Sequence, residues 1–92
     1  LSVMEFRLRE LIWDEFNSEH ISKHDVTISE IEEACSNLIT VLSSHSGRYI
    51  AMGLTKSGRK LSMIVNIKPD GAWYIVTARD TSRKERRIAE YD

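Results

Sequence analysis

The sequence predicts a small α+β domain in which two N-terminal helices pack on a three- to four-stranded antiparallel sheet, followed by a C-terminal helix. Three observations lead to this prediction. Helix-capping signals stand in the first half and at the end of the chain, strand-like apolar segments fill the region between them, and short turn-forming connections join those segments. Sequential strands with short loops form antiparallel meanders. With 92 residues, the chain has room for one domain, residues 1–92, and one core.

The N-terminal half is predicted to contain a short strand and two helices. Residues 8–13 end in an apolar run, and residues 1–7 before them are expected to be a flexible extension. Asp14, a favourable N-cap, begins a helix that continues to about residue 24. The second helix begins with a capping box, Thr27-x-x-Glu30, and ends near Asn37. Its apolar residues recur at three- and four-residue spacing, which places them on one face.

The C-terminal half is predicted to contain the sheet and the last helix. A brief extended segment precedes a serine-rich loop, and three longer strands follow it, separated by turns that contain glycine or proline. A second capping box, Ser82-x-x-Glu85, begins the final helix. The predicted segments are residues 39–42, 48–54, 60–67 and 73–79 for the extended piece and the strands, and 82–91 for the helix.

Charge is divided unequally along the chain, although the formal net charge is only −1. Residues 1–46 carry three basic and nine acidic side chains, a balance of −6, whereas residues 47–92 carry ten basic and five acidic ones, a balance of +5. This division predicts a dipolar molecule with a cationic face that attracts a polyanion. The alternative is a well-solvated surface whose asymmetry has no function.

The cysteine content and the N-terminal sequence bear on location. Cys35 is the only cysteine, so no intrachain disulfide can form, and an intracellular protein is expected. The first ten residues contain no apolar run long enough for a secretory signal or a membrane span. We therefore expect a protein of the cytoplasm that has no membrane partner.

Arg79 is the strongest candidate for a functional residue, because a guanidinium at a rigid strand end can bind two phosphate oxygens. The alternative is a structural salt bridge to Asp80 or to a carboxylate of the first helix. The basic residues of the final helix surround the helix, so at most two of them can face one ligand, and a solvated helix surface is the alternative for this group. These residues are Arg83, Lys84, Arg86 and Arg87.

Histidine and aromatic residues supply further candidates. His20 and His24 have the four-residue spacing of a zinc pair, but no third ligand accompanies them, so no metal site is predicted. His24 is instead a candidate for proton transfer, since histidine titrates near neutral pH. Trp73 and Tyr74 are neighbours on a strand, so one of them faces away from the core and can stack on a base. Contact with the core or a helix is the alternative for that ring.

Four stretches of the chain, in order and spacing, resemble the BrnT family, the ribonuclease toxins of bacterial toxin–antitoxin modules. The stretches are residues 13–15, 23–27, 47–53 and 76–87. The resemblance implies a RelE-like fold and cleavage of RNA without a metal or another cofactor, by attack of a ribose 2′-hydroxyl on the adjacent phosphodiester. It also implies a BrnA-like antitoxin partner with a ribbon-helix-helix fold, and it leaves a homodimer open.

The resemblance assigns roles to particular residues. Arg79 and Arg48 are expected to be phosphate or transition-state ligands, and Lys23 and His24 to transfer protons or contact phosphate. Glu85 is expected to be either a base or the ion-pair partner that orients Arg79. The remaining expected RNA-binding residues are Arg83, Lys84 and Arg87.

The chain also departs from the family pattern. Asn17 stands where a lysine is typical, Ile21 where an asparagine is typical, and Leu54 where a cation often follows Gly53. These departures leave two alternatives open. One is a non-catalytic module of the same fold that binds a protein partner or RNA, and the other is an interaction domain with a cationic docking face.

Overall fold

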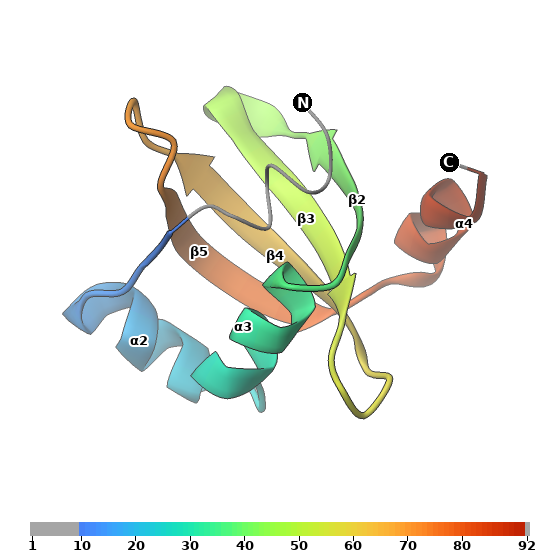
Figure 1. Ribbon diagram of the computed structural model, residues 1–92, viewed down its shortest axis with the longest axis horizontal. Helices are drawn as coiled ribbons and strands as arrows, with labels where there is room; N and C mark the ends of the chain where they lie inside the picture. Colours follow the sequence, from blue (N-terminus) through green and yellow to red (C-terminus); the bar gives the residue numbers. More distant parts are fainter. Residues whose placement is uncertain (1–9, 92) are drawn as a thin grey trace.

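The computed structural model describes residues 10–91, so the flexible extension expected at residues 1–7 lies outside the described part of the chain. It shows an α+β arrangement of three helices and a five-stranded sheet, together with a short 3₁₀ turn at His45–Gly47 (Figure 1). None of its helices is long and apolar enough to cross a membrane. The elements, in chain order, are β1 (Leu11–Ile12), α2 (Glu15–Ser22), α3 (Ile28–Cys35), β2 (Leu38–Ser43), β3 (Arg48–Leu54), β4 (Lys60–Ile67), β5 (Trp73–Asp80) and α4 (Arg83–Tyr91).

The sheet has the strand order β1-β5-β4-β3-β2. Strands β2 to β5 form the expected antiparallel meander, and β3 and β4 have the predicted bounds. The expectation of a purely antiparallel sheet of three to four strands was wrong, because β1 adds a fifth strand that runs parallel to β5. A hydrogen bond from the Trp73 amide to the Glu10 carbonyl, 2.7 Å long, extends this pairing. Parallel pairing joins segments that are distant in the sequence, so local turn signals do not reveal it.

The predicted caps define where the helices begin. The Asp14 carboxylate accepts a hydrogen bond from the Asn17 amide at 3.0 Å, which caps α2. Thr27 and Glu30 form a reciprocal capping box at the start of α3. At α4, the Ser82 amide donates to Glu85 and the Glu85 amide donates to the Ser82 hydroxyl, as the second capping box predicted. These contacts satisfy amides that have no partner within the helix.

The core lies between one face of the sheet and the helices α2 and α3 (Figure 1). Alternate β4 residues, such as Met63 and Val65, point into it, while Ile21 and Ile31 enter from the helices. Cys35 is buried there, and burial raises the pKa of its thiol to about 12.

Two strand residues control how the layers meet. Gly53 of β3 lies so close to α3 that an added Cβ would be 2.0 Å from the Ala34 carbonyl oxygen, so the close approach requires glycine. On β5, Trp73 is buried at 1% exposure, whereas the following residue, Tyr74, is half-buried on the opposite face. The prediction that one of these two rings faces away from the core is therefore confirmed.

Candidate functional site

Arg79 lies near the end of β5 and forms a two-pronged ion pair with Glu85 of α4. The Nη1–Oε1 distance is 2.6 Å and the Nη2–Oε2 distance is 2.7 Å. The Arg79 side chain is 47% exposed, whereas that of Glu85 is only 11% exposed. The guanidinium of Arg79 is thus held between the end of β5 and the first turn of α4, and the edge that does not contact Glu85 reaches solvent.

Glu85 is anchored by further donors. The Ser62 hydroxyl of β4 donates to Glu85 Oε1 at 3.0 Å, as does the Ser82 amide. These contacts, above all the hydrogen bonds from Arg79, lower the pKa of Glu85 to about 2. A carboxylate with such a pKa accepts a proton poorly at neutral pH. Of the two expected roles for Glu85, the geometry favours the ion-pair partner that orients Arg79 over the base.

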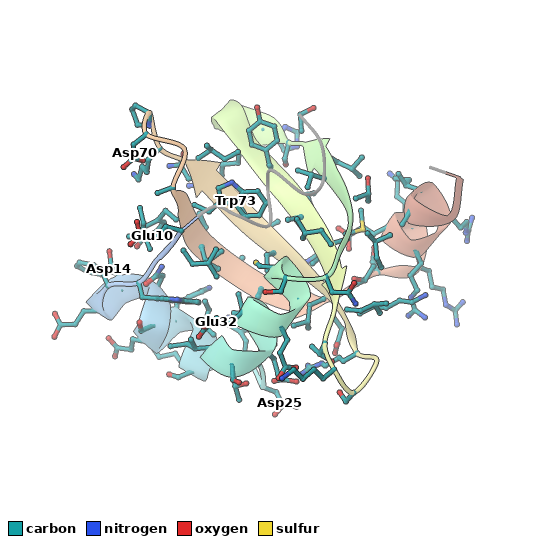
Figure 2. All side chains as sticks on the ribbon, in the orientation of Figure 1. Glu10, Asp14, Asp25, Glu32, Asp70 and Trp73 are labelled. Atoms are coloured by element: carbon teal, nitrogen blue, oxygen red, sulfur yellow. The ribbon has the colours of Figure 1, made fainter. Side chains whose placement is uncertain are left out.

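The basic side chains of α4 supply charge that Glu85 does not neutralise. Arg83, Lys84, Arg86 and Arg87 are all exposed, and none forms an ion pair with another described side chain. α4 lies at one end of the molecule, whereas Glu10 and Asp14 of the acidic half lie at the opposite end, together with Asp70 of the basic half (Figure 2), so the charge division of the sequence is in part also a division in space. An anionic polymer would therefore approach the α4 end preferentially.

Lys23 and His24 lie at the same end of the sheet as Arg79 but on the other side of it, because α2 packs on the core face, whereas Arg79 and its pairing partner Ser62 face α4. Lys23 is the exposed C-cap of α2, and His24 follows it. A single guanidinium, that of Arg59, ties this region to the end of β5. It donates to the Asp25 carbonyl at 2.8 Å through Nη1 and to the Asp80 carboxylate at 2.7 Å through Nε.

Arg48 is placed elsewhere. It begins β3 and pairs with Asn66, whereas Arg79 pairs with Ser62, four residues along β4. The Cα atoms of the two arginines are displaced by four residues of about 3.3 Å along the strands and by two strand spacings of about 4.8 Å across them. Because these displacements are perpendicular, the Cα atoms lie roughly 16 Å apart. This is a separation of backbone positions, and Glu85 holds the Arg79 guanidinium against α4. The catalytic residues predicted from the sequence are thus divided, with Arg48 at one end of the strands and Arg79 at the other.

Two features of the surface were not expected from the sequence. Arg59 also donates to Glu30 at 3.0 Å, so it connects α3, the loop before α3 and β5. Phe16 of α2 is 81% exposed and lines an open hollow of about 370 Å³ beside β5. The exposure of Phe16 could have been predicted from the sequence, because helical spacing from the N-cap at Asp14 places it away from the buried Asn17 and Ile21. The contacts of Arg59 could not have been predicted in this way, because its three partners are distant in the sequence.

The residues that the structure describes contain no group of three or more histidine, cysteine, aspartate or glutamate side chains arranged to hold a metal ion. The His20 and His24 rings lie against each other, with centroids 4.7 Å apart. Comparison with known proteins found no match to a protein-family model, to a curated protein or to a solved structure.

Proposed function

We propose that this chain is a BrnT-like toxin of a type II toxin–antitoxin module, a metal-independent endoribonuclease of the cytoplasm that inhibits translation. Its partners are an RNA substrate and a BrnA-like ribbon-helix-helix antitoxin. The observation that carries the proposal is the guanidinium of Arg79, which Glu85 holds at the end of β5 with its outer edge in solvent. A pre-positioned guanidinium can stabilise the charge that develops on a phosphodiester during cleavage.

The proposed reaction needs no group beyond the chain and the RNA. The ribose 2′-oxygen loses its proton and bonds to the adjacent phosphorus, the bond from phosphorus to the 5′-oxygen breaks, and the 5′-oxygen takes up a proton. A 2′,3′-cyclic phosphate remains on one product. Since Glu85 has a pKa of about 2, proton transfer falls to His24 or Lys23, at the same end of the sheet as Arg79.

The remaining cations have a binding role in this proposal. Arg83, Lys84 and Arg87 contact RNA phosphates beside the reacting one, because their side chains are exposed and form no ion pair with another side chain that the structure describes. Arg48 contacts a more distant phosphate of the same strand, since it begins β3 at the end of the strands opposite to Arg79. Binding should therefore weaken steeply as salt is added.

One observation favours a second candidate function, a non-catalytic module that binds RNA or a protein partner. Glu85 neutralises Arg79 and already occupies two of its donor groups. The guanidinium therefore has less charge and fewer free donors to offer a transition state than an unpaired arginine would.

Cleavage of labelled single-stranded RNA in EDTA separates the two candidates. We expect the native chain to give products that end in a 2′,3′-cyclic phosphate, and we expect Arg79→Ala and His24→Ala to cut at least 100-fold more slowly, on the scale of losing one charge-stabilising or proton-transfer group. Lys56→Ala is the matched control, because this exposed lysine lies in the turn between β3 and β4. Thermal melts confirm that each variant folds.

Each outcome has a distinct meaning. RNA binding by the native chain without cleavage would replace the nuclease with the binding module. A native chain that neither binds nor cleaves RNA at low salt would refute both RNA functions. Induced expression in a bacterial host adds the biological test, since growth arrest that Arg79→Ala relieves is expected of a toxin.

A further inference from the structure

Three rings form a stripe along α2 and the turn that follows it. Phe16, His20 and His24 follow one another at four-residue spacing, and all three are exposed. Phe16 and His20 lie one above the other on the helix face, and the His24 ring in the turn beyond the C-cap contacts the His20 ring. The stripe does not serve the core, because the neighbouring positions Asn17 and Ile21 supply the buried side of the helix.

β5 supplies the opposite wall of the hollow beside this stripe. Tyr74 and Val76 line it from β5, and Phe16, Asn17 and His20 line it from α2. Asn17 fixes the spacing between the two elements, because its side-chain amide donates to the carbonyl of Ile75 at 3.0 Å. The hollow thus has rigid walls, most of whose surface is apolar.

The Tyr74 ring is held in place before any ligand arrives. Its hydroxyl donates to both carboxylate oxygens of Asp14, at 3.0 and 2.9 Å. A ring that is already ordered loses little conformational entropy when another ring stacks on it. Phe16, by contrast, leaves most of a large apolar ring exposed to water. This exposure does not stabilise the folded monomer, because the ring gains no hydrophobic burial.

Charges of both signs lie beside the two rings, since the Asp14 carboxylate that accepts from Tyr74 is accompanied by cations. The Lys68 ammonium is 5.4 Å from the centroid of the Tyr74 ring, and Lys23 lies seven residues after Phe16, which is two turns along the same side of α2. Glu15 and Glu19 are also on α2, but their angular positions place them farther from β5 than the stripe. Aromatic rings with flanking cations suit a ligand that combines flat bases with phosphates.

We propose that the hollow between α2 and β5 is a base-binding subsite for single-stranded RNA, in which a base stacks on Phe16 and Tyr74. This inference rests on the proposed function, since it extends the same RNA strand from the Arg79 site. Both α2 and β5 run from this hollow toward Lys23, His24 and Arg79. The subsite selects unpaired bases, because a base inside a duplex cannot present its face to a protein ring.

The test is binding of a fluorescein-labelled, fully 2′-O-methylated single-stranded RNA, measured by anisotropy. This probe lacks the attacking hydroxyl, so binding is measured without cleavage. Inorganic polyphosphate, which has phosphates but no bases, serves as the second probe. We expect Phe16→Ala to weaken RNA binding by about 5-fold to 150-fold, the range for loss of one base–aromatic stack, and to leave polyphosphate binding unchanged.

Conservative and matched variants complete the experiment. Phe16→Trp keeps a ring and should restore RNA affinity. Ile28→Ala removes another exposed apolar side chain, one on α3 that does not line the hollow, and should bind RNA as the native chain does. Since Phe16 is 81% exposed, its replacement should barely change the thermal melt.

Two outcomes would overturn the inference in distinguishable ways. If Phe16→Ala binds RNA as tightly as the native chain, or weakens RNA and polyphosphate equally, the hollow does not stack bases, while the proposed RNA function stands. If the native chain fails to bind the RNA even at low salt, the proposed function itself fails and the subsite falls with it.

Discussion

The ion pair between Glu85 and Arg79 makes a quantitative prediction about stability. In the folded chain, the pKa of Glu85 is lowered from 4.5 to about 2, first by the hydrogen bonds from Arg79. At about 1.4 kcal/mol for each pH unit, this difference corresponds to about 3 kcal/mol of folding free energy. Because the Arg79 side chain is 47% exposed, solvent screens part of this energy. Glu85→Gln should therefore lose about 2 kcal/mol at pH 7.

The sign of the pH dependence follows from the direction of the pKa change. The carboxylate is favoured in the folded state, so its contribution is complete above the unfolded pKa of 4.5 and is lost as the pH falls toward 2. The difference in unfolding free energy between the native chain and Glu85→Gln should thus shrink as the pH falls from about 5 to about 2. Taking this difference removes the contributions of other carboxylates, whose pKa values are also lowered, such as those of Asp14 and Asp80.

Urea unfolding of both chains at pH 7, 4 and 2.5 measures this difference. Glu19→Gln, an exposed glutamate on α2, removes the same charge and should change stability little. A difference that stays constant across the three pH values would refute the argument. In that case packing or the hydrogen bonds that glutamine retains, rather than the charge, would account for the role of Glu85.

Four other substitutions test the fold. Gly53→Ala should destabilise the domain by about 3 kcal/mol or more, because the new methyl group meets the α3 backbone, and thermal melts should show Gly47→Asn, in open space at φ 73°, to be nearly neutral. Asn17→Leu should cost about 2 to 4 kcal/mol in urea unfolding, since the carbonyls of Ile12 and Ile75 lose their donor; a neutral result would show that water replaces it. Arg59→Lys should cost about 1 kcal/mol at low salt and less at high salt, and an effect that is insensitive to salt would contradict the ionic explanation.

The parts of the fold that depend on neighbouring residues could be predicted from the sequence. Each of the two predicted capping boxes, at Thr27 and Ser82, consists of four consecutive residues, and the helices begin where these boxes predict. The turns on either side of β4 have equally local signals, so β3 and β4 have their predicted bounds. The pairing of β1 with β5 joins residues some sixty positions apart, such as Leu11 and Trp73, and no local pattern encodes it.

The candidate site could be predicted only in part. Arg79 was identified because it lies at a recognisable strand end, whereas the site role of Glu85 was an expectation from the resemblance, and its local pattern indicated only a helix cap. Their ion pair was one alternative among several. It depends on the angle between β5 and α4, which cannot be predicted from the sequence. The distance between Arg48 and Arg79 depends on strand direction and register, which place these arginines toward opposite ends of the sheet. Spacing along the chain carries no such information.

The structure also gives physical meaning to the positions where the chain departs from the BrnT pattern. Asn17 is buried, and its side chain serves Ile12, Ile75 and Asp14 at once, accepting from the Asp14 amide at 2.8 Å. A lysine has no acceptor and could not replace that last contact. Ile21, at 1% exposure, belongs to the core. In this chain, both positions hold α2 against β5, so any charge that stabilises a bound phosphate must come from Arg79 and the exposed cations around it. The effect of Arg79→Ala on cleavage is consequently the sharpest test of whether the chain is a nuclease.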